Sequence, residues 1–115
     1  MRDHNVTGKE RAQHIMDAIS EMKLFTKGHS KITFLSDKVV INACLFQFAI
    51  IGEAIMHIDE NVLEKYDYPW HKVRGFRNFI LHEYHAIEFG IVWEAIKKDL
   101  PELKSIVEEM LNKEF

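Results

Sequence analysis

Residues 39–51 read VVINACLFQFAII, an almost continuous apolar run that contains only two polar side chains. A membrane-spanning helix needs about 20 predominantly apolar residues, and this run ends at Gly52, well before that length. A helix that is apolar over most of its surface is instead buried by its neighbours. The run therefore predicts the central helix of a bundle, capped by Ser36 and ending near Ile58.

Helix signals also occur on both sides of this run. Thr7 and Glu10 have the spacing of a capping box, and Gly28 suits the end of the amphipathic helix that follows them. Pro69 fits the first position of a later helix, because its missing N–H costs nothing there. Between the two, residues 61–64 could form a short helical turn.

The C-terminal part predicts two further helical segments. Asp99 and Glu102 resemble a second capping box, with Pro101 inside its first turn. A helix that starts near Glu88 should therefore end or kink here before the last helix begins. We find no strand-like alternation, so the expected fold is all-α, with residues 1–115 forming one domain built as a four- to five-helix bundle.

Composition limits the classes of function. The chain has 115 residues, 47% of them hydrophobic and 29% charged, as expected of a globular protein. Its net charge of −3 argues against extensive phosphate-tracking contact with nucleic acid, although a small local site remains possible. Cys44 is the single cysteine, so no intrachain disulfide can form; we expect it to be buried, in a protein of the cytoplasm. Residues 1–11 lack an apolar core, and we expect no signal peptide.

The helix predicted over residues 70–87 contains RGFRNFILHEYH at positions 74–85, an unusual mixture for a solvent-facing surface. At about 100° per residue, one arc of about 120° collects the residues that we expect to face the core: Val73, Phe76, Phe79, Ile80 and Ile87. An opposite arc of about 160° collects polar residues, with Trp70 and Leu81 among them: Arg74, Arg77, Asn78, His82, Tyr84 and His85.

This polar arc has the chemistry needed to cleave RNA. A histidine can move a proton near neutral pH, an arginine grips phosphate oxygens in a fork, and Asn78 could orient a group by hydrogen bonds. Arg77 and His82 lie about 140° apart on an ideal helix, so one copy of the helix does not bring them together. Two copies related by a two-fold axis could, because a symmetric interface presents the same surface twice.

The central helix carries two features that could belong to this site. Gly52 costs roughly 1 kcal/mol in a helix interior relative to Ala, and close packing against another helix is the simplest reason for it. Glu53 and His57 are one turn apart and could pair with each other, pair with other side chains, or place Glu53 toward an active cleft. We expect no metal site, because His82 and His85 do not have the spacing of a known zinc motif.

Arg77, His82 and Tyr84 together match R-x4-H-x-Y, which resembles the signature of HepT-like toxins in the HEPN superfamily. Other segments are similar to the same family, namely I-G-E-A at residues 51–54, P-W-x4-G-x-R-N at residues 69–78, and residues 91–93 and 99–103. The resemblance covers roughly residues 40–110. The short motif alone would be weak evidence for the family. All of these segments in the same order, in a helical chain of this length, are specific evidence for it.

The resemblance implies a two-fold dimer of HEPN-like bundles, with Arg and His of both chains lining a cleft that cleaves RNA without a metal or cofactor. It implies Arg77 and His82 as the catalytic residues, and we expect Asn78, Glu53 and Arg74 to support them. It also implies a partner, an MntA-like nucleotidyltransferase antitoxin that transfers AMP to Tyr84. Phosphates added there would place negative charge where the RNA phosphate should bind.

Two other classes of function fit the same residues. The protein could be a non-catalytic helical partner that binds a nucleotide or substrate for a nucleotidyltransferase, or a purely structural dimerisation domain. Cleavage of RNA by the purified protein distinguishes the enzyme from both.

Overall fold

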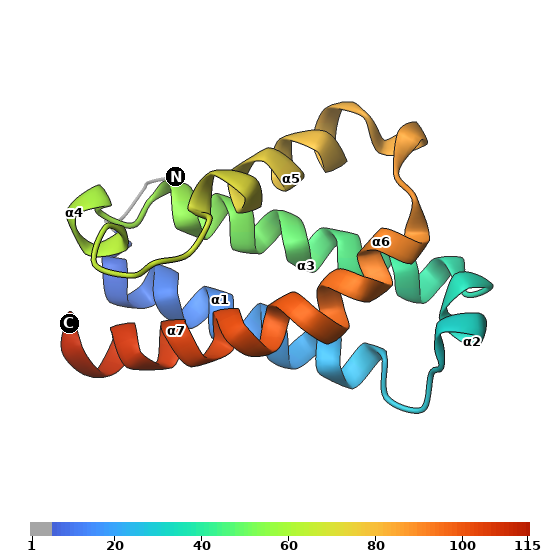
Figure 1. Ribbon diagram of the computed structural model, residues 1–115, viewed down its shortest axis with the longest axis horizontal. Coiled ribbons are helices and arrows are strands. Elements are labelled where there is room, and N and C mark those ends of the chain that lie inside the picture. The colour runs from blue at the N-terminus through green and yellow to red at the C-terminus, as the bar shows by residue number, and fades with distance from the viewer. Residues whose placement is uncertain (1–5) are drawn as a thin grey trace.

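The computed structural model describes residues 6–115, and within them every regular element is helical (Figure 1). The α-helices, in chain order, are α1 (Gly8–Phe25), α2 (Lys31–Leu35), α3 (Lys38–Met56), α4 (Glu60–Leu63), α5 (Trp70–His82), α6 (Phe89–Glu94) and α7 (Leu100–Lys113). A 3-10 turn covers Tyr84–Ala86, and a π-helical segment covers Ala95–Asp99. The predicted all-α fold is confirmed. The expectation about a signal peptide falls partly on residues 1–5, which lie outside the described residues.

Helix α3 is the centre of the bundle, as predicted. It lies between α5 on one side and α1 on the other, while α7 packs along α1 (Figure 1). Its buried side chains make up much of the core, namely Ile41, Cys44, Leu45, Phe48, Ile51, Ala54 and Ile55. By length and composition α3 could cross a membrane, but core helices of globular bundles share this property. Burial also raises the pKa of the Cys44 thiol to about 11.

The first two predicted helix starts have different outcomes. The capping box of α1 is confirmed, because the Thr7 hydroxyl accepts from the Glu10 N–H at 3.1 Å and the Glu10 carboxylate accepts from the Thr7 N–H at 3.1 Å. The Ser36 cap is wrong by one residue. Asp37 caps α3 by accepting from the Val40 N–H at 3.1 Å. Ser36 instead ends the short helix α2, which the sequence pattern did not predict.

The second predicted capping box, at Asp99, is wrong. Asp99 has helical backbone angles and makes no side-chain cap, because the chain continues from α6 through the π-helical segment into α7. The Leu100 N–H bonds to the Ala95 carbonyl five residues earlier, which marks the wider π turn. This turn lies directly before Pro101. In a regular helix interior the proline ring would clash with a backbone carbonyl of the preceding turn, and the wider π turn lies where that clash would occur.

Helix α5 is shorter than predicted and ends at His82 instead of Ile87. After the 3-10 turn, the backbone at Ile87 is extended and its side chain packs against the core. Two assignments made on the ideal wheel are also wrong. Trp70 is buried, and its indole N–H donates to the Leu63 carbonyl at 3.0 Å, whereas Phe79 is 39% exposed.

Helices α3 and α5 come into close contact at Gly52, which confirms the packing predicted for this glycine. A Cβ atom placed on Gly52 would overlap the Cβ of Arg77 and lie 2.7 Å from its Cγ. Any larger residue would therefore push Arg77 and its helix away from α3. Gly75 also lies in the interior of α5, but a Cβ there would meet nothing within 4 Å.

We expect the two glycines to respond in opposite ways to alanine. Gly52→Ala should lower the free energy of unfolding, because overpacking costs about 1–3 kcal/mol and exceeds the gain in helix propensity of ~1 kcal/mol. Gly75→Ala gains the propensity alone and should raise stability by about 0.5–1 kcal/mol. Urea denaturation of both variants measures the difference, and equal stability would contradict this account of the α3–α5 contact.

Candidate functional site

Arg77 is held by two polar neighbours. One terminal nitrogen of its guanidinium donates to a Glu53 carboxylate oxygen at 2.8 Å, and the other donates to the Asn78 side-chain oxygen at 3.0 Å. The second Glu53 oxygen lies 3.0 Å from His57 Nε2. Both pairings that the sequence suggested for Glu53 therefore occur together. The hydrogen bond from His57, followed by the positive charge of Arg77, lowers the pKa of Glu53.

A groove of about 250 Å³ lies beside this pair, between α1, α3 and α5. It is lined by polar and apolar side chains: Arg11, His14, Phe46, Ala49, Ile50, Glu53, Ala54, Arg77 and Leu81. Glu53 and Arg77 thus line the same groove, and the catalytic role of that groove stays a prediction. Two apolar residues at its edge are well exposed, Phe46 at 65% and Leu81 at 52%.

His82 and Tyr84 lie at the exposed end of α5, outside this groove. His82 is the last residue of the helix, and residues 81–86 are all exposed. The Tyr84 hydroxyl donates to the side-chain oxygen of Asn42, on α3, at 2.6 Å. Within one protomer, the groove that contains Arg77 therefore does not include His82, in keeping with their angular separation on the helix.

The two remaining polar residues of the predicted arc, Arg74 and His85, also lie away from the groove. Arg74 donates to a Glu60 carboxylate oxygen at 3.1 Å, so it joins α5 to α4. His85 is exposed within the 3-10 turn. Among residues 6–115, no three His, Cys, Asp or Glu side chains come close enough together to hold a metal ion.

The helices that build this site match a known family. A family profile described as "Ribonuclease HepT-like" matches residues 15–110 of the chain. The chain belongs to the HepT-like ribonuclease family. The matched region contains α3, α5 and all residues that line the groove except Arg11 and His14.

Several curated proteins are similar to this HepT-like chain over most of its length. A protein of Caldanaerobacter subterraneus named as a putative RNase is 35% identical over 103 residues, which cover 89% of this chain and 92% of the relative. A Methanocaldococcus jannaschii protein with a similar name is 32% identical over 82% of this chain and 87% of its own. A Thermococcus cleftensis protein named "Probable ribonuclease HepT" is 28% identical over 89% of this chain and 94% of its own. No solved structure gave a significant match.

The site of this HepT-like protein includes residues that sequence reasoning missed. Asn42, the partner of Tyr84, is one of the two polar side chains in the apolar run, and that exception was the available signal. Arg11 and His14 are one turn apart on α1, far from the motif in sequence. Nothing in their local pattern separates them from ordinary surface residues of an amphipathic helix.

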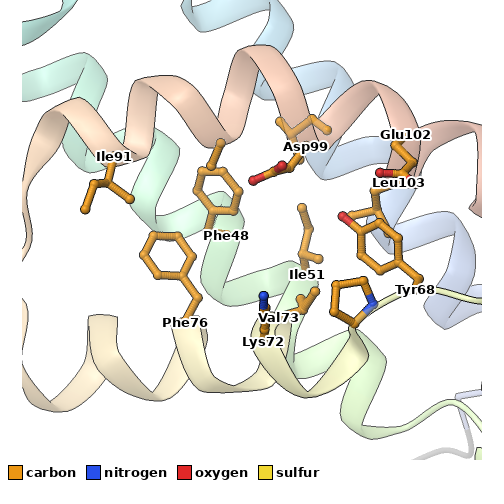
Figure 2. Close-up of a pocket in the computed structure, with 13 residues that line it drawn as sticks. Phe48, Ile51, Tyr68, Lys72, Val73, Phe76, Ile91, Asp99, Glu102 and Leu103 are labelled. Carbon is orange, nitrogen blue, oxygen red and sulfur yellow. The ribbon is translucent and has the colours of Figure 1, made fainter.

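A second cleft, of about 320 Å³, lies on another face of α5, toward α6 and α7 (Figure 2). Its walls are mostly apolar, with Phe48 and Phe76 at one end and Tyr68 at the other (Figure 2). Burial and the nearby Asp99 carboxylate raise the pKa of Tyr68 to about 12. None of the motif residues lines this cleft, and it shares no lining residue with the groove that contains Arg77.

We expect the titration of Glu53 to report its two contacts. A lowered pKa means that these contacts stabilise the folded HepT-like protein above about pH 4.5, and that this contribution is lost as the pH falls through the lowered value. His57→Ala should raise the pKa of Glu53 the most, and Arg77→Ala should raise it as well. Carboxyl carbon NMR measures both shifts. Arg74→Ala is the control and should leave the Glu53 titration unchanged; unchanged titration in all three variants would contradict these contacts.

Proposed function

We propose that this protein is a metal-independent endoribonuclease toxin that acts in the cytoplasm as a two-fold dimer. The observation that supports this most directly is the placement of Arg77, whose guanidinium is oriented by Glu53 and Asn78 at the wall of an open groove. A guanidinium has five N–H donors, so these two contacts leave donors for a phosphate. Membership of a ribonuclease family and the names of the relatives support the same activity.

The proposed reaction uses the ribose of the RNA as the nucleophile. His82 takes the proton from a 2′-hydroxyl, and the 2′-oxygen forms a bond to the adjacent phosphorus. The bond between phosphorus and the 5′-oxygen breaks, and this leaving oxygen takes a proton from a histidine. Arg77 holds the phosphate and stabilises the charge that develops on its oxygens. The products are a 2′,3′-cyclic phosphate and a free 5′-hydroxyl.

Two copies of the chain complete the proposed site. The groove of one protomer contains Arg77 but not His82, which supports a site whose histidine comes from the second copy. Exposed apolar side chains around the motif provide a surface for this contact, including Phe46, Phe79 and Leu81. Glu53 and Asn78 then act as positioning residues for Arg77, and Arg74 supports the site from the next turn of the helix.

The proposed antitoxin is an MntA-like nucleotidyltransferase that modifies Tyr84. The Tyr84 oxygen forms a bond to the α-phosphorus of ATP, pyrophosphate leaves, and the phenolic proton passes to a base. Tyr84 is 47% exposed, so its hydroxyl can be reached from solvent. The ester has lost the proton that Tyr84 donates to Asn42, and its phosphate adds negative charge beside His82. The added negative charge opposes the binding of RNA.

The cleavage assay compares the wild type with variants of the two motif residues. We expect His82→Ala to lower the rate of RNA cleavage by about 10²–10⁴-fold, because it removes the proton-transfer group, and Arg77→Ala to lower it by about 10²–10³-fold. His71→Ala, an exposed histidine at the start of the same helix, is the matched control and should keep full activity. Addition of EDTA should change nothing.

Equal cleavage by all variants would reject the proposed mechanism. Binding of nucleotide without any turnover of RNA would instead identify the chain as a non-catalytic partner of a nucleotidyltransferase.

A second experiment tests the proposed modification. Incubation with an MntA-like nucleotidyltransferase and ATP should add AMP groups to the wild type, as measured by intact mass, and should abolish RNA cleavage. Tyr84→Phe keeps the ring but lacks the oxygen nucleophile, so its mass should not change. Tyr66→Phe is the control and should be modified as the wild type is. Transfer to Tyr84→Phe at the wild-type rate would place the modification elsewhere.

A further inference from the structure

Arg11 differs from the other arginines of residues 6–115 because it has no partner there. Arg74 and Arg77 each donate to a carboxylate, at 3.1 Å and 2.8 Å. The guanidinium of Arg11 makes no ion pair or hydrogen bond with the described residues, and its Nε atom is buried without an acceptor. Buried donors in folded proteins nearly always have an acceptor, so an exception calls for an explanation.

The place of Arg11 indicates what that acceptor is. It lines the same groove as Arg77, on the opposite wall supplied by α1. The carboxylate of Glu53 already offsets the charge of Arg77, whereas no carboxylate among residues 6–115 pairs with Arg11. Ile50 and Ala54 lie between these polar residues and make the groove partly apolar, which strengthens the attraction between Arg11 and an anion.

We propose that Arg11 is a second phosphate-binding residue of the groove, holding a backbone phosphate of the RNA next to the scissile one. This inference rests on the proposed ribonuclease function and names a contact beyond the R-x4-H residues. The planar fork of arginine matches two oxygens of a phosphodiester, and Nε together with a terminal nitrogen supplies the two parallel donors. The Arg11 side chain would have to turn toward the groove for its covered Nε–H to reach a phosphate oxygen, and the bound strand would then cross the groove from α1 to α5.

The first test measures binding without cleavage. A single-stranded RNA with 2′-O-methyl riboses cannot be cut through its 2′-oxygen, and its affinity is followed by fluorescence anisotropy at several salt concentrations. Arg11→Ala should bind about tenfold more weakly, and the slope of log K against log salt should become less steep by about 0.7, the value for one phosphate contact with a single strand. Arg11→Lys should keep the slope but lose affinity, because it retains the charge and loses the fork.

Lys9→Ala is the matched control. Lys9 lies in the same turn of α1 as Arg11 and has the same positive charge, but it is exposed and lies outside the groove. This variant should keep the wild-type affinity and slope. Equal slopes for Arg11→Ala and the wild type, or equal losses in Arg11→Ala and Lys9→Ala, would overturn the proposal.

The second test uses the wild type alone and separates this proposal from the proposed function. The Arg11 Nε–H resonance is followed by NMR while inorganic phosphate is added, and it should shift in a saturable manner. If the RNA does not bind but phosphate shifts this resonance, the ribonuclease proposal fails and the anion site stands. If neither ligand affects Arg11, the anion site is overturned.

A carboxylate from a second copy of the chain is the competing acceptor, and sedimentation tests it. Dissociation of the oligomer in Arg11→Ala, with no change in the salt dependence of RNA binding, would show that Arg11 joins two copies and would overturn the phosphate assignment. An unchanged oligomer together with the reduced slope supports it.

Discussion

The close contact between Gly52 of α3 and Arg77 of α5 is the constraint on which the candidate site depends. Because position 52 has no side chain, the Cβ and Cγ of Arg77 lie against the backbone of α3. The next residue of that helix, Glu53, then reaches the guanidinium at 2.8 Å. One missing methyl group thus brings together the residue that is proposed to bind phosphate and the carboxylate that orients it.

This arrangement explains how a chain with a net charge of −3 can still offer a site for an anion. Such a site does not need positive charge spread over one face, as in a protein that tracks nucleic acid, because two arginines, Arg11 and Arg77, line the same groove. Glu53 holds Arg77 in a fixed direction, while Arg11 contributes a charge that no described side chain offsets. The groove therefore combines an arginine held by Glu53 with one that has no partner among residues 6–115.

Helix α5 has a different role on each of its faces. One face packs on α3 and carries Arg77 into the groove, and another lines the apolar cleft toward α6 and α7. Its C-terminal end is exposed, and the Tyr84–Asn42 hydrogen bond joins the following turn to α3. The motif is therefore divided between a held arginine and an exposed histidine and tyrosine, a division that favours completion of the site by a second copy.

The sequence by itself determined the helical class, the central helix, the capping box at Thr7 and the family, because these depend on local spacing and on apolar runs. It failed where neighbours in space decide the outcome. The end of α5 at His82 follows from contacts of Tyr84 and Ile87 that a helical wheel does not contain, and the π turn before Pro101 replaced the expected cap at Asp99. Only the tertiary structure placed Arg11 and Asn42 beside the motif, because packing of α1 and α3 brings distant residues together in a way that no short pattern encodes.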